Sequence, residues 1–262
     1  MTYWILVDKR LSPNERLILC VGEILLKRAI RNDYDGNVKD VVVHGIAIVS
    51  CLEEYRRQGY ISLYHREMHK VLRDWKPEEG VTVGSILYSD IGSKWMSVLG
   101  WLPEPKYDHL LFPSVNGVKP TSVQDILEGD IASLCERDEA MERTAMDKPS
   151  EKRRFIILPN AEHMLFLIRK ADLATKHLFD HIPKSKGCIV GPPGKQVWAI
   201  WYHRYYGHPD SADASNVLHI MRRVIEGDET RGWPTIGSTE RDSSSSTEGP
   251  GICDQSCSGC RS

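Results

Sequence analysis

A loop rich in arginine and glycine follows the most β-branched stretch of the N-terminal half. Arg56 and Arg57 carry positive charge there, and Gly59 stands directly before a segment with helical apolar spacing. Glycine lets a backbone approach a ligand closely, and the free N–H groups at a helix start attract anions. Arginine adds charge that suits a phosphate group. The loop therefore predicts a phosphate-binding site. Arg-x-x-Gly before a helix is a common pattern, however, and Gly59 can equally serve only to form a turn.

The elements on either side of this loop must position it. The β-branched run 41–49 predicts a central strand, and residues 62–75 have the apolar spacing of an amphipathic helix. A short strand at 84–89 and a second helix at 91–99 follow. An order of strand, helix and strand favours a parallel strand pair joined by a crossover connection.

The remaining apolar segments predict further elements around this unit. The N-terminal segment reads as a strand at 4–7 and another at 17–21, which either continues through 23–30 or turns, before an Asp35-Gly36 hairpin turn. Further along we expect a helix over 131–145, a charged break at 148–154, a helix over 161–179 capped by Asn160, a hairpin of 188–190 with 196–205, and a strand at 217–225.

Composition limits the class of protein. The chain has 262 residues, 41% of them hydrophobic, which allows one or two domains. Its 34 Lys and Arg nearly balance 36 Asp and Glu, so no global field recruits nucleic acid or an anionic membrane. We find no membrane-spanning run and no secretory signal. The seven cysteines are an odd number, four of them scattered through apolar stretches, and we therefore expect a reducing, cytoplasmic environment.

Two motifs together give the chain a family resemblance. They are Glu-Tyr-Arg-x-x-Gly-Tyr at 54–60 and Leu-Tyr-Ser-Asp-Ile-Gly at 87–92. The first resembles the pyrophosphate-binding motif of the GNAT acetyltransferases. More narrowly, both segments are similar to the fungal lysine N6-acetyltransferase family of lysine catabolism, as are the segments at 4–8, 134–139 and 197–201. The resemblance covers most of residues 3–226.

The resemblance implies an α+β fold, with a GNAT-like mixed sheet flanked by helices, incomplete at its N-terminal edge and altered at its C-terminus. It implies acetyl-CoA as co-substrate and a small-molecule amine, the side-chain amine of lysine, as acceptor. The main chain that would hold the pantetheine arm belongs to Ile48, Val49, Ser50 and Cys51. The residues that would hold the pyrophosphate are Arg56, Arg57, Gln58, Gly59, Tyr60 and Ile61.

The groups that would perform the chemistry have competing interpretations. His44 is a candidate general base, against a structural histidine on the central strand. Asp90 is a candidate for binding a substrate ammonium, although a helix cap is favoured. The tyrosine that serves the family as general acid corresponds to Met96, whose thioether has no proton to give. Tyr88 could replace it as the acid, but a buried tyrosine that is hydrogen-bonded to the backbone is favoured. The alternative function is therefore a catalytically impaired cofactor-binding or interaction protein.

We divide the chain into a partial GNAT-like domain (1–112), a C-terminal region (113–231) and a Ser/Gly/Cys-rich disordered tail (232–262). Aromatic residues at 198–206 favour a core hairpin over a stacking platform for nucleic acid. Arg222 and Arg223 are expected on a solvated face. The cysteines at 253, 257 and 260 have the spacing of radical iron–sulfur enzymes, but no surrounding barrel is indicated, and we assign no metal site. The oligomeric state is left open.

Overall fold

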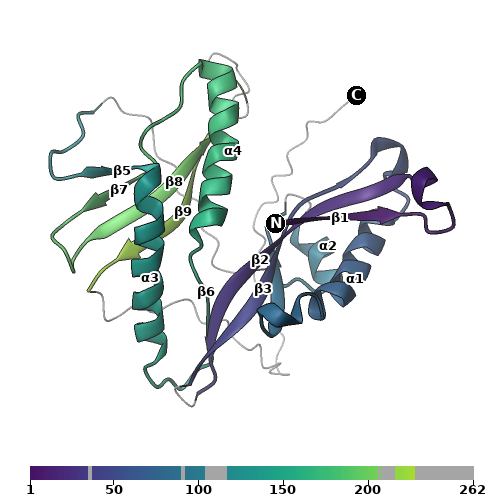
Figure 1. Ribbon diagram of the computed structural model, residues 1–262, viewed down its shortest axis with the longest axis horizontal. Helices are drawn as coiled ribbons and strands as arrows, with labels where there is room; N and C mark the ends of the chain where they lie inside the picture. The colour runs from purple at the N-terminus through teal and green to yellow at the C-terminus, as the bar shows by residue number, and fades with distance from the viewer. Residues whose placement is uncertain (35–36, 90–91, 104–116, 206, 208–215, 228–262) are drawn as a thin grey trace, which may run out of the picture.

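The computed structural model describes residues 1–34, 37–89, 92–103, 117–205, 207 and 216–227. Its described part is a mixed α+β fold of two sheets with helices, and this confirms the fold class expected from the sequence (Figure 1). The strands are β1 Thr2–Val7, β2 Ile18–Asn32, β3 Val38–Cys51, β4 Thr82–Leu87, β5 Gln124–Ile126, β6 Arg154–Ile157, β7 Gly187–Val190, β8 Val197–Arg204 and β9 Val217–Ile225. The helices are α1 Tyr60–Arg73, α2 Ser93–Val98, α3 Ile131–Met146 and α4 Ala161–Phe179.

A long antiparallel hairpin of β2 and β3 forms the centre of the N-terminal sheet. Strand β2 runs unbroken from Ile18 to Asn32, so the segment at 23–30 continues the strand rather than turning. The pairing with β3 extends to Asn32 opposite Val38, while the Asp35-Gly36 turn lies outside the described residues. Strand β1 pairs with the outer edge of β2, and β4 pairs in parallel with β3, as the strand–helix–strand order predicts.

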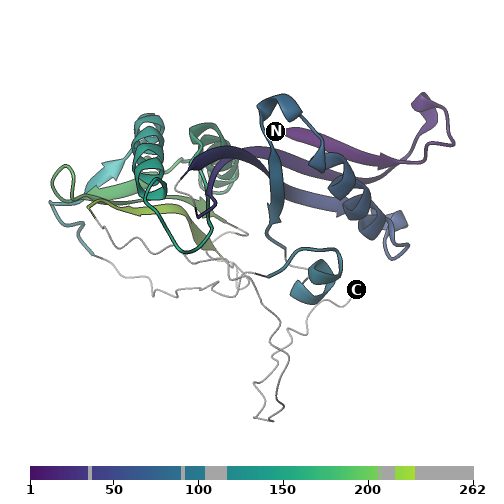
Figure 2. The same ribbon diagram turned by 90° about the horizontal axis from the view of Figure 1, so that it is seen from below.

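Helix α1 covers one face of this sheet. Its apolar stripe includes Tyr64, Met68 and Leu72, which pack against Ile24 of β2 and Ile46 of β3. Figure 2 shows α1 lying along that face. Residues on alternate positions of the same strands, such as Ala29 and Val43, point to the opposite face and form a separate cluster there. The two periods, 3.6 in the helix and 2 in the strands, therefore match the sequence-based prediction.

The second sheet has the strand order β5-β7-β8-β9 and carries α3 and α4 on one face (Figure 1). Trp198 of β8 is almost completely buried between them, together with Ile131 and Ile168. This confirms a core position for the aromatic strand. Helix α4 begins where predicted, because Asn160 Oδ1 accepts a hydrogen bond from the backbone N–H of His163 at 2.8 Å.

Strand β6, between α3 and α4, joins the N-terminal sheet instead of the second one. It pairs antiparallel with residues 29–32 of β2, continuing the edge that β1 occupies further along. Neither β6 nor the three-residue β5 was predicted, since both are too short for their alternation to be distinguished from a loop. The boundary proposed at 112/113 lies outside the described residues, as do the tail at 232–262 and its cysteines.

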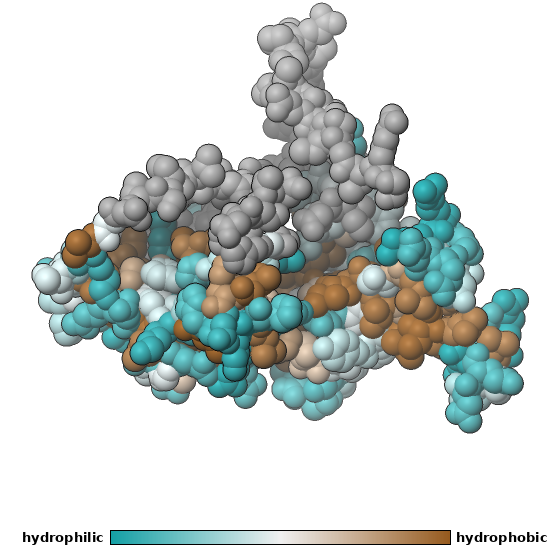
Figure 3. Space-filling model, turned by 90° about the horizontal axis from the view of Figure 1, so that it is seen from above, coloured by the Kyte–Doolittle hydropathy of each residue, from teal (hydrophilic) through white to brown (hydrophobic). Residues whose placement is uncertain are grey.

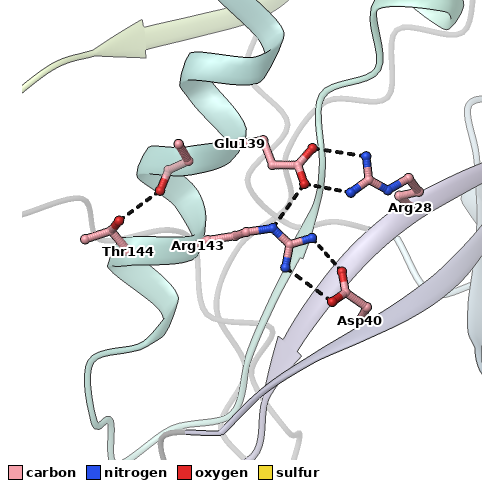
Figure 4. Close-up of polar contacts among 6 residues, drawn as sticks. Arg28, Asp40, Glu139, Arg143 and Thr144 are labelled. Carbon is pink, nitrogen blue, oxygen red and sulfur yellow. Dashed lines mark hydrogen bonds and ion pairs between the residues drawn. The ribbon is translucent and has the colours of Figure 1, made fainter.

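A group of charged side chains also connects α3 to the β2–β3 hairpin (Figure 4). Glu139 pairs with Arg28 of β2 at 2.7 Å and with Arg143 at 3.0 Å. Arg143 in turn pairs with Asp40 of β3 at 2.6 Å. A network of ion pairs thus holds α3 against the hairpin. An isolated exposed ion pair would contribute little to stability.

Arg222 is not on a solvated face, which corrects the sequence-based expectation. Its guanidinium lies 2.6 Å from carboxylate oxygens of both Asp138 and Glu142, and all three side chains are buried or nearly so. Alternation in β9 explains the placement, because Arg222 shares a face with the core residue Val224. Arg223 points the other way and is exposed, as expected.

Replacing Arg222 with methionine is expected to lower the free energy of unfolding by about 3–5 kcal/mol, since it removes the cation that pairs with both buried carboxylates. Urea unfolding followed by circular dichroism measures the loss. Arg223→Met is the matched control and should change stability by less than about 0.5 kcal/mol. Equal losses in the two variants would contradict the buried ionic cluster.

Candidate functional site

A β-bulge interrupts the β2–β3 ladder just before the arginine-rich loop. Ile48 and Val49 together face the single residue Gly22 of β2. Ile48 has a φ of 49°, which is rare for a β-branched residue and costs on the order of 1–3 kcal/mol. A side chain at position 22 would collide with the hydroxyl of Tyr64, so only glycine leaves room for α1 at this point. The fold therefore keeps a strained residue at the end of its central strand.

Strands β3 and β4 stop pairing at the same place. Their last paired residues are Ile46 and Leu87, after which β3 continues to Cys51. Within the part of the chain that the structure describes, no strand pairs with residues 47–51 on the β4 side. Of the predicted pantetheine residues, Ile48, Val49 and Ser50 thus have an edge available for an extended ligand, in the manner of an added strand, whereas the carbonyl of Cys51 accepts a hydrogen bond from Arg56.

The loop that follows bends sharply onto the start of α1. Arg57 and Gly59 both have positive φ, of 61° and 83°. A Cβ at Gly59 would meet nothing within 4 Å, so the space next to it is open. Two side chains hold the bend, because Arg56 Nε donates to the carbonyl of Cys51 at 3.3 Å and Gln58 Nε2 donates to the carbonyl of Glu54 at 2.9 Å.

The N-terminus of α1 has unused donors. Among the described residues, no backbone carbonyl accepts a hydrogen bond from the N–H groups of residues 57–62, and Gly59 provides no side-chain cap. These N–H groups and the helix dipole create positive potential at one point. The exposed side chains of Arg56 and Arg57 add to it. A diphosphate fits this arrangement chemically, and the open space beside Gly59 leaves room for one.

Ile61 stands where the family motif usually has a small residue. Its side chain packs, with that of Tyr60, against the core cluster of α1 and the sheet. It therefore points inward, and the branched side chain does not fill the space beside Gly59. The structure brings the predicted pantetheine and pyrophosphate residues together at one end of β3, namely Ile48, Val49, Ser50, Cys51, Arg56, Arg57, Gln58, Gly59, Tyr60 and Ile61.

His44 is not brought to this loop. Its side chain is fully buried on the α1-facing side of β3, four residues before the bulge. Its Nε2 lies 3.2 Å from Thr82 Oγ1, and its ring packs against Trp75. Burial lowers the pKa of His44, and a backbone group of Leu72 opposes this only in part. These surroundings are those of a structural histidine, so its role as a general base remains a prediction without support from geometry.

The other candidates have separate outcomes. Tyr88 is 80% exposed, so the expectation of a buried tyrosine is wrong, because β4 ends at Leu87 and the next residue leaves the sheet. Met96 is buried in α2. Asp90 lies outside the described residues.

One ionisable residue beside the bulge was missed. Glu23 of β2 pairs with Ala47 of β3 and is only 6% exposed. Its carboxylate raises the pKa of the Tyr3 hydroxyl on β1, first through charge and also through a hydrogen bond. The signal in the sequence is a single acidic residue inside a long apolar strand, which alternation alone cannot assign to a site.

Comparison with known proteins gives one family. Residues 109–247 match the model of the LYC1 GNAT-like C-terminal domain. This is more than half of the chain, and the protein belongs to the family that carries this domain, a family of GNAT acetyltransferase type. The match lies in the second half of the chain and does not include the loop at 52–59. No curated protein and no solved structure matches. Among the described helices, none combines the length and apolarity that crossing a bilayer requires.

Acidification is expected to destabilise the protein partly through His44. In the unfolded chain a histidine takes up a proton near pH 6.5, whereas burial lowers the pKa of folded His44. The unfolded state then binds more protons below pH 6.5, so the free energy of unfolding falls as the pH drops toward the folded pKa. Urea unfolding from about pH 7.5 to about pH 5 should show a shallower fall for His44→Gln than for the wild type. Parallel curves would mean that folding does not lower the pKa of His44.

Proposed function

We propose that this protein transfers an acetyl group from acetyl-CoA to the side-chain amine of a small molecule, with free lysine as the acceptor. The observation that supports it most is the coincidence of three features at one point. These are the bulge at Ile48, the separation of β3 from β4, and the uncapped start of α1 behind Gly59. Together they offer an extended backbone next to an anion site.

In this proposal the chain's main role is to bind and position the cofactor. The N–H groups of residues 57–61 receive the pyrophosphate, assisted by the charges of Arg56 and Arg57. The free edge of residues 48–51 holds the pantetheine arm as an added strand would be held. The cofactor supplies a reactive thioester, and positioning the amine against it lowers the barrier to direct transfer.

The choice of lysine rests on the resemblance of the two motifs to the fungal enzymes of lysine catabolism. We also propose a cytoplasmic location, because the scattered cysteines suggest no disulfide framework and therefore a reducing environment. A binding-only protein is the alternative, motivated by Met96, whose buried thioether offers no proton to a departing thiolate. The exposed Tyr88, directly after the end of β4, is the tyrosine nearest to Met96 in the sequence and could supply a proton in its place.

Gly59→Asp is expected to weaken acetyl-CoA binding by about a hundredfold or more, because a carboxylate would face the diphosphate at short range. Isothermal titration calorimetry measures the affinity. Gly194→Asp is a close control, since Gly194 has nearly the same φ, 81° against 83°, and equally open space, but lies in the β7–β8 turn. Unchanged affinity in Gly59→Asp would reject the placement of the cofactor.

Turnover separates the two functions. Wild-type protein with acetyl-CoA and L-lysine is expected to release coenzyme A and form N6-acetyllysine, detected by thiol titration and mass spectrometry. Binding heat without any turnover, over a panel of small amines, would favour the binding-only alternative.

A further inference from the structure

Glu23 is a buried carboxylate without a cationic partner among the described residues. It is only 6% exposed, and no lysine, arginine or histidine of the described chain forms an ion pair with it. Its interaction partner is the hydroxyl of Tyr3, which donates to the carboxylate. The Cα of Lys27 lies about 13 Å along the same face of β2, and its side chain leans over Gly45, the partner of Leu25, without forming an ion pair with Glu23 in the described structure. A hydroxyl stabilises a carboxylate far less than a cation does, so Glu23 has unused capacity to bind one.

The side chain of Glu23 points to the face of the sheet opposite α1. Its neighbours Gly22 and Ile24 both face the helix, since Tyr64 abuts Gly22 and Ile24 packs in the core of α1. Alternation therefore directs Glu23 the other way. On that face Leu25 of β2 is buried, Ile5 of β1 is half exposed, and the methylene stem of Lys27 lies over Gly45 of β3. Figure 3 shows hydrophobic residues gathered over this part of the molecule. Such surroundings strengthen the attraction between a carboxylate and a cation.

The position along the strand places this carboxylate beside the bulge. Glu23 pairs with Ala47, the residue directly before Ile48, and Cβ atoms of such cross-strand pairs lie about 5 Å apart. From Ala47 onward β3 has lost its β4 partner. An acyl group carried on an extended arm along residues 48–51 would end near this point. The carboxylate is thus next to the place where the proposed function needs an amine.

We propose that Glu23 is the catalytic residue that binds the acceptor as an ammonium ion and removes its proton, with Tyr3 holding the carboxylate in place. This role rests on the proposed acetyl transfer. It limits the acceptors to alkyl amines that are protonated in solution, because a carboxylate binds the cationic form. The carboxylate takes one proton from the ammonium, which frees the nitrogen lone pair. The nitrogen attacks the thioester carbonyl carbon, so a C–N bond forms as the C–S bond breaks. The departing thiolate takes up the second nitrogen proton, and Glu23 then releases its own proton to water.

The test measures amine binding separately from turnover. Protein saturated with coenzyme A, which has no acyl group, is titrated with L-lysine or with 1,5-diaminopentane. We expect Glu23→Gln to bind both amines at least about tenfold more weakly than the wild type, as for other truncated buried charge pairs. Glu23→Asp, which keeps the charge, should recover part of the affinity. Glu67→Gln on the exposed side of α1 is the control and should leave amine binding unchanged.

Coenzyme A affinity distinguishes the failure of this proposal from the failure of the proposed function. Equal coenzyme A binding by wild type and Glu23→Gln shows that the variant folds and that the cofactor site is intact. Equal affinity of these two proteins for both amines would then overturn the role of Glu23. Wild-type protein that binds coenzyme A but neither amine would overturn the cationic acceptor class. Failure of the wild type to bind coenzyme A would instead overturn the proposed function itself.

Discussion

The extra residue in β3 at Ile48 is the constraint on which the candidate site depends. With two residues facing Gly22, the strand changes direction and its side chains change register at this point. Pairing with β4 ends one residue before Ala47, and the freed edge of β3 continues directly into the loop. Strand β4 itself ends at Leu87, so residues 47–51 of β3 have an open edge at the same point where Ile48 holds a strained backbone conformation.

Strand β2 holds this strained arrangement in place. It pairs with β3 from Cys20 to Asn32, with β1 at one end of its outer edge and with β6 at the other. The salt bridges of Arg143 with Asp40 and Glu139 fasten α3 to the same hairpin (Figure 4). The region that matches the family model therefore contributes a strand and an ionic network to the sheet that carries the loop. The two halves of the chain are thus joined by strand pairing and by ion pairs at the same hairpin.

The sequence predicted the elements with clear periodicity and missed what depends on pairing. Alternation, helical spacing and the Asn160 cap located most strands and all four helices of the described chain. The parallel pairing of β3 with β4 followed from the order of elements. Strand β6 could not be foreseen, because four residues after a charged break carry too little alternation to identify a partner strand. Arg222 was misplaced for a related reason, since only the register of β9 shows that it shares a face with Val224.

The candidate site shows the same division between local and long-range information. Gly59 and the arginines are neighbours in sequence, so a motif could reveal them, and the positive φ of Gly59 gives that motif its physical basis. His44 was attractive as a histidine on the central strand, but its burial against Trp75 depends on where α1 ends. Glu23 was not singled out from the sequence, because its proposed role depends on its pairing with Ala47 beside the bulge in β3. A bulge in β3 gives a function to a carboxylate in β2, and only the register between the two strands can show this.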